Sequence, residues 1–499
     1  MSTPSPARVR FAPSPTGRFH LGSARSALYD FLYARQTEGQ FVLRIEDTDR
    51  KRFDPNAESE LIEGLHWMGI EWDEGPDVGG PFAPYRQSER LELYHERAEE
   101  LVRSDHAYHC FCSVERLAQV RQAQLKSRQP PHYDGLCRNL SREEAEARSS
   151  AGEPHVVRFK VSKEGSTTAL DLMRGAITVE NSTIDDFVLL KSDGMPVYHL
   201  AALVDDHEMQ ITHVLRGSEW LPTFPLHVLI YRAFGWQEPI WVHLSVFLNP
   251  SGKGKMSKRH AVDAKGGAMS IYPLDMRGMG YLPEAIVNWI ALMGWSYDDR
   301  TELFSMKELI ERFSLEKLNP SPAAVNFTKL EHFNGIYIRG LPPDVLAVRL
   351  RPFFEASGLK VDSDRLRAIT PLIQERISTF EEALEMAGFF FRPTVSPDPV
   401  QLVGKDMTPA ASAEAARRAR EVVAGLEAWD ATILERDLRA LAEELGLSAG
   451  QLFGILRIAV TGQPVSPPLI ETMHLLGKAE VISRIERAIE LLEAMPKLD

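Results

Sequence analysis

The stretch that decides the fold is RVRFAPSPTGRFHLGSAR, at residues 8–25. Val9 and Phe11 alternate with Arg10, which predicts a strand, and the PSPTG that follows interrupts any regular element. Apolar residues then recur at helical spacing, which predicts a helix over about residues 21–36. A strand that enters a helix through a glycine-containing turn directs free backbone N–H groups at one point, and this geometry favours phosphate binding.

Two short segments point to a nucleotide site. HLGS, at His20–Ser23, places a histidine donor and a glycine in the first turn of the predicted helix. KMSKR, at Lys255–Arg259, follows SGKG and forms a basic loop about halfway along the chain. Each segment alone also fits an ordinary surface role. A cationic loop of this kind can approach a triphosphate and stabilise the charge on a departing pyrophosphate.

Together, HLGS and KMSKR resemble the two signature motifs of class I aminoacyl-tRNA synthetases. HLGS alone is a weak signal, whereas an ordered set of segments is specific. The whole set resembles glutamyl-tRNA synthetases of the bacterial type and spans nearly the full chain. Its further members are PSPTG at 13–17, RIEDTDR at 44–50, DEGPDVGGPFAPYRQSER at 73–90, SDGMPVYHLAALVDDHEM at 192–209, LRGSEWL at 215–221, GYLPEAIVNWIALMGWS at 280–296 and LRIAVTG at 456–462.

The composition indicates a globular protein of several domains. The chain has 499 residues, 44% hydrophobic and 25% charged, so three or more domains are expected. No apolar run reaches the ~20 residues that a membrane span needs, and the N-terminus lacks an apolar signal segment. We therefore expect a cytoplasmic protein without a membrane partner. Three cysteines do not suggest a disulfide framework. The net charge of −13 requires any RNA contact to be a confined basic patch.

The predicted fold class is an α/β Rossmann-type catalytic domain with an inserted α+β domain, followed by an all-α C-terminal anticodon-binding region. The resemblance implies that the inserted domain grips the acceptor end of a tRNA, that a stem-contact domain carries the KMSKR loop, and that the protein is a monomer. The expected boundaries are 1–80 with 190–250 for the catalytic domain, 81–189 for the insertion, 251–330 for the stem-contact domain and 331–499 for the helical region.

Local patterns add specific expectations. Gly39 is expected to close the first helix, and FVLRIED at 41–47 to form a buried strand parallel to the first. TVENSTIDDFVLL at 178–190 suggests a hairpin, and LPEAIVNWIALMGWS at 282–296 an amphipathic helix. Glu46 falls at the carboxyl end of the second strand, where ligands bind in such sheets, so we favour it as the anion for a substrate ammonium.

The amino-acid site is assigned by resemblance. A guanidinium fork binds a carboxylate bidentately, and the sequence offers Arg10 and Arg216 at predicted sheet ends. The resemblance implies that Arg10 and Tyr198 meet the side-chain carboxylate of glutamate and that Arg216 meets the α-carboxylate. It implies that Ser14 and Glu46 meet the ammonium. The glutamate-binding set is Arg10, Ala12, Ser14, Glu46, Tyr198 and Arg216.

Amino-acid activation needs a bound triphosphate, an aligned carboxylate and a stabilised pyrophosphate, with little side-chain acid–base chemistry. The motif Pro13–Ser23 suits the first task and the motif Lys255–Arg259 the last. Mg²⁺ is expected to bridge the phosphates of ATP. The expected ATP-binding residues are Thr16, His20, Gly22 and Lys258, and the expected catalytic residues are His20, Lys255, Lys258 and Arg259.

The three cysteines follow the pattern Cys-x-Cys, then 24 residues, then Cys. Structural zinc requires four ligands. Some relatives carry zinc here with a closing Cys-x-His, but this sequence has Asn139 where that histidine would stand. Bound zinc and three reduced, packed thiols are the two alternatives. The candidate ligands are Cys110, Cys112 and Cys137, with Tyr133 in a position that resembles a tyrosine ligand of shorter relatives and His109 and His132 as further candidates.

The expected function is ligation of L-glutamate to tRNA(Glu), with tRNA(Gln) as a second candidate acceptor. The resemblance implies that glutamate activation requires the tRNA, and that Arg376 contacts the last anticodon base. One alternative is a glutaminyl-tRNA synthetase, whose anticodon-binding part is built of β-structure rather than helices. A second is a small-molecule nucleotidyltransferase, which shares the HLGS-type turn but needs no RNA. A third, a non-catalytic RNA-binding protein, fits poorly with intact KMSKR and RIED segments.

Overall fold

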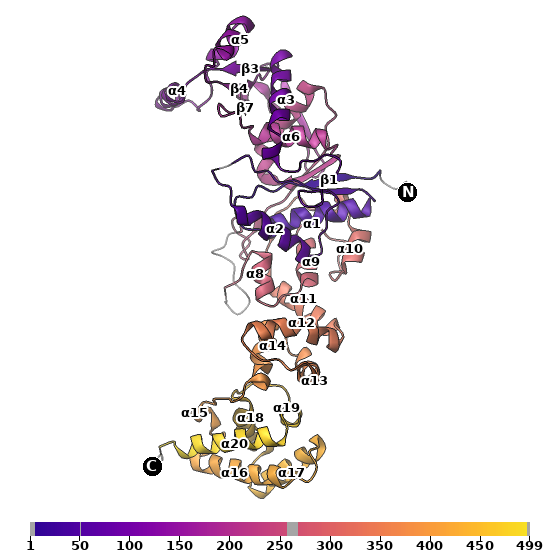
Figure 1. The fold of residues 1–499 in the computed structure, drawn as a ribbon, viewed down its shortest axis with the longest axis vertical. Coiled ribbons are helices and arrows are strands. Elements are labelled where there is room, and N and C mark those ends of the chain that lie inside the picture. Colours follow the sequence, from indigo (N-terminus) through magenta and orange to yellow (C-terminus); the bar gives the residue numbers. More distant parts are fainter. Residues whose placement is uncertain (1–4, 50, 257–267, 497–499) are drawn as a thin grey trace. The chain divides into compact units, whose positions relative to one another are not determined.

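The computed structural model describes residues 5–49, 51–256 and 268–496. These residues form two compact units, which are treated separately below (Figure 1). Unit 1 comprises Met1–Met276 and Pro283–Thr328, and unit 2 comprises Arg277–Leu282 and Lys329–Asp499.

The regular elements are given in three groups. The strands are β1 (Arg8–Phe11), β2 (Gln40–Leu43), β3 (Ala107–Cys110), β4 (Val156–Phe159), β5 (Ser166–Asp171), β6 (Gly175–Glu180), β7 (Val188–Leu190), β8 (His213–Gly217), β9 (Ile240–Leu244), β10 (Phe247–Leu248) and β11 (Ala323–Ala324). The α-helices up to residue 312 are α1 (Leu21–Gln36), α2 (Pro55–Trp67), α3 (Leu91–Arg103), α4 (Val114–Lys126), α5 (Arg142–Ser150), α6 (Tyr198–Glu208), α7 (Phe224–Phe234), α8 (Pro273–Gly278), α9 (Pro283–Ala291) and α10 (Met306–Arg312). From residue 327 onward they are α11 (Phe327–Gly340), α12 (Pro343–Ala356), α13 (Ser363–Gln374), α14 (Phe380–Ala387), α15 (Pro399–Leu402), α16 (Pro409–Gly425), α17 (Ala431–Glu444), α18 (Ala449–Thr461), α19 (Leu469–Leu476) and α20 (Lys478–Glu493).

Parallel strands form the centre of unit 1. β1 pairs in parallel with β2, and β8 pairs in parallel with β9 in a second sheet of order β6-β5-β9-β8. The two sheets meet where the Thr212 backbone N–H donates to the Arg8 carbonyl at 2.8 Å. α1 packs against both sheets and against α9 and α10. α3, α6 and α7 share one hydrophobic core with β2, β8 and β9. The predicted strand, helix and parallel strand are therefore confirmed.

The connection between α1 and β2 differs from the expectation. Thr37 is the C-cap of α1, and the left-handed residue after it is Glu38, with φ of 52°. Gly39 is required for a different reason: a Cβ there would lie 1.8 Å from the Ala7 carbonyl oxygen. β2 also ends at Leu43 rather than at residue 47: beyond it the N–H groups of Arg44 and Glu46 still donate to Phe11 and Pro13, while Ile45 forms a bridge with Arg86.

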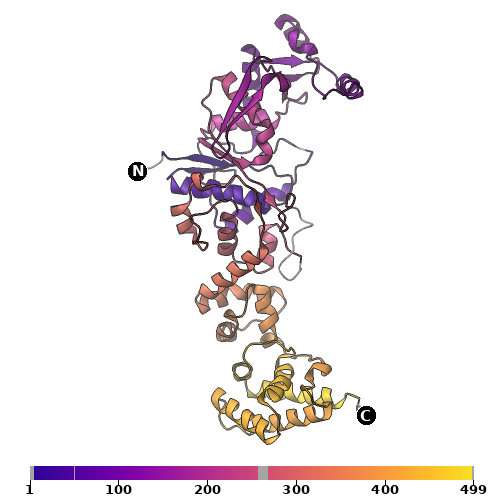
Figure 2. The same ribbon diagram turned by 180° about the vertical axis from the view of Figure 1, so that it is seen from behind.

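The hairpin predicted at 178–190 is wrong. β6 pairs with β5 over its whole length, whereas β7 pairs with β4 in the separate antiparallel sheet β3-β4-β7. The observed hairpin is β5–β6, and Figure 2 shows it as two long adjacent strands. At the end of β5, Asp171 pairs in parallel with Trp241 of β9. Part of the segment expected to be inserted thus extends the sheet that carries β8 and β9.

The helix predicted as amphipathic is instead buried on all sides. In α9 every residue from Ala285 to Ala291 is buried. Its one amide side chain, Asn288, is satisfied internally, since it donates to the Glu302 carbonyl at 2.7 Å and accepts from the Phe304 N–H at 2.6 Å. The polar residue therefore reflects a buried hydrogen-bonded position and not an exposed face.

Unit 2 is helical throughout its described part, as predicted for the C-terminal region. α16 and α20 pack along each other, and α18 packs against both. α18 begins with a capping box in which the Ser448 side chain accepts from the Gln451 N–H while the Gln451 side chain accepts from the Ser448 N–H. Among the described residues of the chain, no helix combines the length and apolar character that crossing a membrane requires.

Candidate active site

A cavity of about 550 Å³ opens where β1, the start of α1, β8 and α6 converge. It brings together most of the residues expected from the sequence. Thr16 does not line it: this residue is exposed, and its N–H donates to the Ser14 carbonyl at 2.8 Å. Lys258 and Arg259 lie outside the described residues. The expected residues that line the cavity are Arg10, Ala12, Ser14, His20, Gly22, Glu46, Tyr198, Arg216 and Lys255.

The start of α1 is organised by His20, which is the N-cap. The His20 Nδ1 accepts hydrogen bonds from the N–H groups of Gly22 at 3.1 Å and Ser23 at 3.3 Å. The Leu21 N–H donates to the Ile271 carbonyl at 2.9 Å. The expectation of free N–H groups at this turn is therefore wrong, because side chain and backbone already satisfy them. Since Nδ1 accepts, the proton of the neutral imidazole is on Nε2, which lies near the Ser23 hydroxyl.

Arg10 is held in place by a buried ionic network. Its Nε donates to Asp206 Oδ1 at 3.0 Å, and Arg44 Nη1 donates to the same oxygen at 2.8 Å. Arg44 Nη2 in turn donates to Glu46 Oε1 at 3.1 Å. Burial is the largest single influence and opposes the charge of Arg10, but the Asp206 carboxylate, with smaller contributions from Tyr198 and Asp30, leaves the pKa of Arg10 raised. Asp206 therefore keeps the Arg10 guanidinium charged at the cavity wall.

Glu46 is a buried carboxylate whose charge depends on its partners. Burial raises the pKa of Glu46 to about 6, although the charges of Arg44 and Arg10 act in the opposite direction. At neutral pH the side chain is ionised and lines the cavity. The cavity thus places the buried carboxylate of Glu46 in the same wall as the buried guanidinium groups of Arg10 and Arg216, which suits a ligand with two carboxylates and one ammonium.

Arg216 lies on β8 and is buried, with 7% of its surface exposed. Its Nη2 has no hydrogen-bond partner among the described residues, although it is a buried donor. Its Nη1 lies 3.5 Å from the Tyr198 hydroxyl, and the Tyr198 ring stacks on Trp220 with the ring centres 4.0 Å apart. A buried guanidinium nitrogen without a partner is costly, so this position favours an anionic ligand.

Within the described part of the chain, Lys255 and Met256 of the KMSKR segment line the cavity. Leu248 of β10 forms a bridge with Lys255, and the next N–H, that of Met256, donates to the Phe247 carbonyl at 2.8 Å. These contacts join the start of the loop to β10. The side chain of Lys255 is exposed and lines the cavity.

Several residues of this region were missed by the sequence analysis. His227 interrupts the apolar helix α7 and His243 interrupts the apolar strand β9, and both are fully buried. A polar residue within an apolar run is the signal that could have identified them, because a buried polar group requires partners. Arg44 carries the same signal, because it stands between Leu43 and Ile45, whereas Arg25 is followed by the polar Ser26 and carries none.

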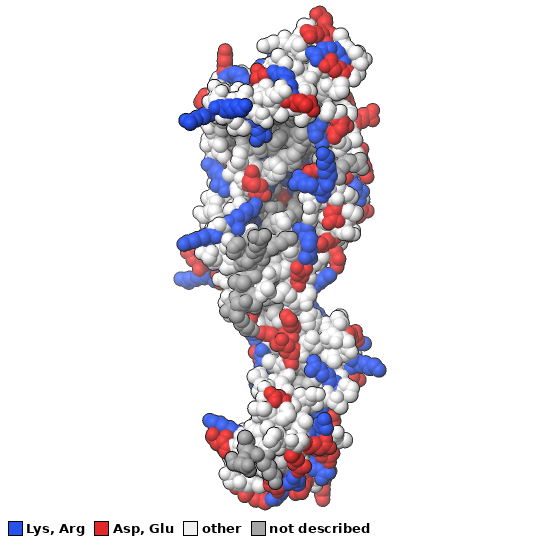
Figure 3. Space-filling view, turned by 90° about the vertical axis from the view of Figure 1, so that its left-hand side faces the viewer, with Lys and Arg blue, Asp and Glu red and all other residues white. Residues whose placement is uncertain are grey.

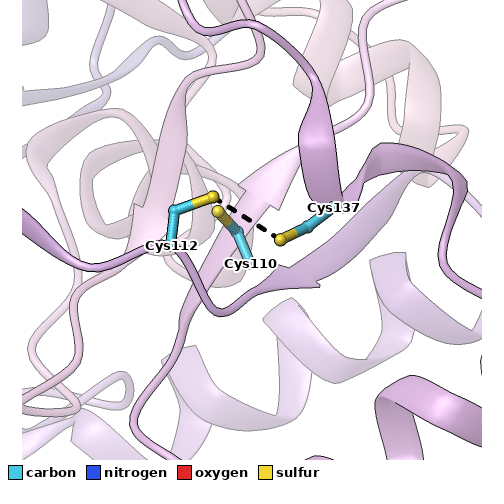
Figure 4. Close-up of side chains that lie close together, drawn as sticks. All are labelled: Cys110, Cys112 and Cys137. Carbon is cyan, nitrogen blue, oxygen red and sulfur yellow. Dashed lines mark hydrogen bonds between the residues drawn. The ribbon is translucent and has the colours of Figure 1, made fainter. Parts of the chain in front are cut away.

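A second cluster lies at the end of β3. The Sγ atoms of Cys110, Cys112 and Cys137 all lie within 4.8 Å of one another, and Figure 4 shows the three side chains converging. The Tyr133 hydroxyl is 3.3 Å from Cys110 Sγ and 3.5 Å from Cys112 Sγ. His132 instead contacts Gln124, and His109 contacts Glu99 at 3.1 Å. The structure thus groups the three thiols with Tyr133.

The surface charge is mixed. In Figure 3, Lys and Arg side chains stand on both sides of a hollow, interspersed with Asp and Glu side chains. The net charge of −13 is therefore not spread as a uniformly acidic surface. Such a distribution leaves local positive groups that can contact phosphates.

Comparisons with known proteins identify the family. Residues 6–332 match the family model for the catalytic domain of class I tRNA synthetases (E and Q), and residues 345–489 match that for an anticodon binding domain. A glutamate–tRNA ligase from Dehalococcoides mccartyi is 47% identical over 98% of this chain and 99% of the relative. One from Roseiflexus sp. is also 47% identical, over 97% and 96%.

Solved structures point the same way. A crystal structure of a glutamate tRNA ligase from Elizabethkingia meningosepticum, in complex with its amino acid, has a TM-score of 0.86 and 37% identity, over 97% of this chain and 99% of that one. A glutamate–tRNA synthetase from Elizabethkingia anophelis has a TM-score of 0.83 and 36% identity, with the same coverage. The chain belongs to the glutamate–tRNA ligase family.

Proposed function

We propose that this protein activates L-glutamate with ATP and transfers it to the 3′-terminal adenosine of tRNA(Glu). The observation that carries the proposal is the cavity wall, which contains the buried side chains of Arg10, Arg216 and Glu46. The names of the similar proteins and the match to an anticodon binding domain support the same reaction. The glutaminyl alternative lacks support, because unit 2 is helical throughout its described part.

The amino acid is proposed to bind by charge complementarity. Arg10 and Tyr198 receive the side-chain carboxylate, and Arg216 receives the α-carboxylate through Nη2, which has no partner among the described residues. Ser14 and Glu46 receive the ammonium, beside Ala12. Glutamine would leave the buried Arg10 facing a neutral amide, and such a mismatch can discriminate by roughly 10⁴ or more.

The nucleotide is proposed to lie against the start of α1. A Cβ at Gly22 would stand only 3.1 Å from the His20 ring, so glycine at this position lets His20 cap the helix. The α-carboxylate of glutamate attacks the α-phosphate of ATP, and pyrophosphate leaves. A hydroxyl of the terminal adenosine then attacks the adenylate carbonyl, and AMP leaves. Lys255, with Lys258 and Arg259 of the same motif, stabilises the charge on the pyrophosphate, and bound Mg²⁺ would add positive charge to the same phosphates.

Zinc is proposed at the thiol cluster. Tetrahedral zinc with Zn–S distances of ~2.3 Å requires sulfur atoms roughly 3.8 Å apart. Cys112 Sγ and Cys137 Sγ are 3.6 Å apart, and the Tyr133 hydroxyl lies close to two of the thiols as a fourth oxygen ligand. The donor set therefore fits the ion. In this position zinc would tie β3 to the 3₁₀ helix η2 (Leu136–Asn139) that carries Cys137.

The test of the main proposal is aminoacylation of purified tRNAs. We expect labelled glutamate to be esterified to tRNA(Glu), with little incorporation of labelled glutamine. Pyrophosphate exchange in the presence and absence of tRNA would separate this reaction from that of a small-molecule nucleotidyltransferase, for which RNA is not needed. Charging of glutamine in place of glutamate, or exchange indifferent to tRNA, would refute the proposal. Parallel assays with tRNA(Gln) determine whether that tRNA is a second acceptor.

A further inference from the structure

A chain of buried side chains lies behind Arg216 and is separate from the residues proposed to contact glutamate. Arg216 Nε donates to His243 Nε2 at 3.0 Å, and Arg216 Nη1 donates to His227 Nδ1 at 2.8 Å. His243 comes from β9 and His227 from α7. Both imidazoles are fully buried, so neither contacts solvent.

On the His243 side the hydrogen-bond directions are fixed by Asp171. Asp171 Oδ2 lies 2.8 Å from His243 Nδ1 and accepts from the His243 backbone N–H at 2.9 Å. An ionised carboxylate only accepts, so His243 Nδ1 carries the ring proton. Nε2 is then the acceptor that Arg216 Nε requires. Asp171 therefore sets the tautomer that can bind the guanidinium.

On the His227 side the directions are fixed by the guanidinium itself. A guanidinium only donates, so His227 Nδ1 must accept from Arg216 Nη1, and the ring proton is on Nε2. That Nε2 lies 2.9 Å from His199 Nδ1, which accepts from it. Burial first, and then the charge of Arg216, holds the pKa of His227 well below its usual value. Burial also lowers the pKa of His243.

The two imidazoles therefore hold the guanidinium in one orientation. Nε and Nη1 are bound to protein, whereas Nη2 has no partner among the described residues. The surrounding groups are aromatic: the Trp241 ring lies 4.9 Å from the Arg216 guanidinium carbon, and the Phe224 ring lies 4.7 Å from the His243 ring. Neutral acceptors orient a buried cation without cancelling its charge, which a carboxylate in the same place would do.

We propose that His243 and His227 are positioning residues that aim Arg216 at the substrate, with Asp171 fixing the tautomer of His243. Their specific task is to leave the charge of Arg216 available for an α-carboxylate. This inference rests on the proposed function, in which Arg216 binds that carboxylate of glutamate. We call His243, His227 and Asp171 the relay. No residue of the relay touches the reacting atoms, so its loss should act on glutamate binding rather than on the chemical step.

The two histidines permit a crossed test, because they present different ring nitrogens to Arg216. The amide of glutamine reaches the position of Nε2 in histidine, whereas that of asparagine reaches the position of Nδ1. His243→Gln keeps an acceptor for Arg216 and His243→Asn removes it. At position 227 the order is reversed, so His227→Asn keeps the acceptor and His227→Gln removes it. A purely structural role for the imidazoles does not predict such a reversal.

We expect KM for glutamate to rise about tenfold or more in His243→Asn and His227→Gln, and severalfold less in the other two variants. The kcat and the KM for ATP should change much less than the KM for glutamate. His213→Gln is the matched control, since His213 lies three residues before Arg216 on the same strand and contacts Tyr33 and Thr212. Equal losses from both amides at each position, or no loss from any, would overturn the relay.

Two further measurements separate failure of the relay from failure of the proposed function. If wild-type protein charges tRNA(Glu) but Arg216→Ala leaves KM for glutamate unchanged, the assignment of Arg216 fails, and the relay loses its purpose with it. If Arg216→Ala raises KM as expected, the crossed variants decide the relay alone. Nitrogen chemical shifts of ¹⁵N-histidine in the wild-type protein should show Nδ1–H for His243 and Nε2–H for His227. The opposite tautomer at either position would overturn the relay even if the variants do not fold.

Discussion

At the scale of single residues, Arg10 shows how a charged side chain can be both buried and available. Asp206 binds its Nε, and the side chain lines the cavity with 4% of its surface exposed. We expect Arg10→Ala to reduce kcat/KM for glutamate by about 10²-fold or more, because a buried bidentate ion pair is lost. The measurement is tRNA-dependent pyrophosphate exchange at varied glutamate concentration.

The matched control for that variant is Arg18→Ala. Arg18 is an exposed arginine that pairs with Glu60 and Asp275 instead of lining the cavity. Arg18→Ala should keep kcat/KM for glutamate within about twofold of the wild-type value, as expected for loss of a surface ion pair. An unchanged kcat/KM in Arg10→Ala would remove Arg10 from the site.

Glu46 predicts a pH dependence. Its pKa is raised to about 6, so the fraction of protein with an ionised Glu46 falls as the pH drops through that value. The ammonium of glutamate then loses its counter-ion, and KM for glutamate should rise about fourfold between pH 7.5 and pH 5.5. Glu46→Gln should show a high KM that no longer varies over this range. A wild-type KM that is flat across it would exclude Glu46 as the ammonium ligand.

Sequence analysis identified the site residues that lie in family-like segments. It missed the buried residues that hydrogen-bond to them. Arg10, Glu46 and Arg216 were found because the segments that contain them resemble a known family. His243 stands within an apolar strand, which marks it as a buried polar residue, but the partner that fixes its role, Asp171, is 72 residues away in the sequence. Such a pairing is set by the order of strands in the sheet, and no local pattern encodes it.

At the scale of elements, the most direct kinetic prediction concerns the KMSKR segment at Lys255–Arg259. Lys258→Ala should lower the rate of glutamate activation by about 10²–10³-fold, because its charge acts on the departing pyrophosphate. Glutamate affinity, measured by calorimetry, should change little. Lys253→Ala is the control from just before that segment, since Lys253 is exposed and does not line the cavity. Equal losses in rate and affinity would refute the assignment of Lys258 to the transition state.

The thiol cluster gives a second prediction for an element. Purified protein should contain about one zinc ion per chain, and chelation should lower the melting temperature by about 5 °C or more. Cys137→Ser should abolish zinc binding, and Tyr133→Phe should weaken it. Tyr108→Phe is the control, because its hydroxyl bonds Asp186 rather than a thiol. Metal-free protein that is unaffected by added zinc would favour the alternative of reduced, packed thiols.

Periodicity predicted elements better than it predicted their partners. The helix at 21–36 and the parallel pairing of β1 with β2 follow from the spacing of apolar residues. The false hairpin at 178–190 arose because two strands that are neighbours in sequence joined different sheets. The helix at 283–291 was misjudged because its polar residue, Asn288, is satisfied within the core. Strand pairing and burial depend on the whole fold, which a local window does not contain.

At the scale of the whole molecule, each compact unit has its own proposed task. Unit 1 contains the cavity, and the match to an anticodon binding domain falls largely in unit 2. In unit 2, Arg376 is exposed just beyond α13, and burial together with its charge lowers the pKa of Arg457. Arg457 is itself held by hydrogen bonds to Ser466 and Pro467, so Arg376, whose side chain is exposed, is the arginine proposed to contact RNA.

Arg376→Ala should therefore lower kcat/KM for tRNA(Glu) about tenfold and leave KM for ATP and glutamate unchanged, because those ligands bind in unit 1. Aminoacylation at varied tRNA concentration provides the measurement. The control is Arg367→Ala, an exposed arginine of α13 that pairs with Asp364. If both variants behave alike, the effect belongs to general surface charge and not to recognition by Arg376.

The position of Asp171 at the tip of the β5–β6 hairpin has a mechanical consequence. Its Oδ1 accepts from the turn residues Met173 at 3.1 Å and Arg174 at 2.9 Å, while its Oδ2 contacts His243. The Asp171 carboxylate thus binds the hairpin turn and, through His243, orients Arg216, the residue proposed to bind the amino acid. If a nucleic acid displaced that hairpin turn, the same carboxylate would move with it. Binding of RNA and binding of glutamate would then be coupled through Asp171.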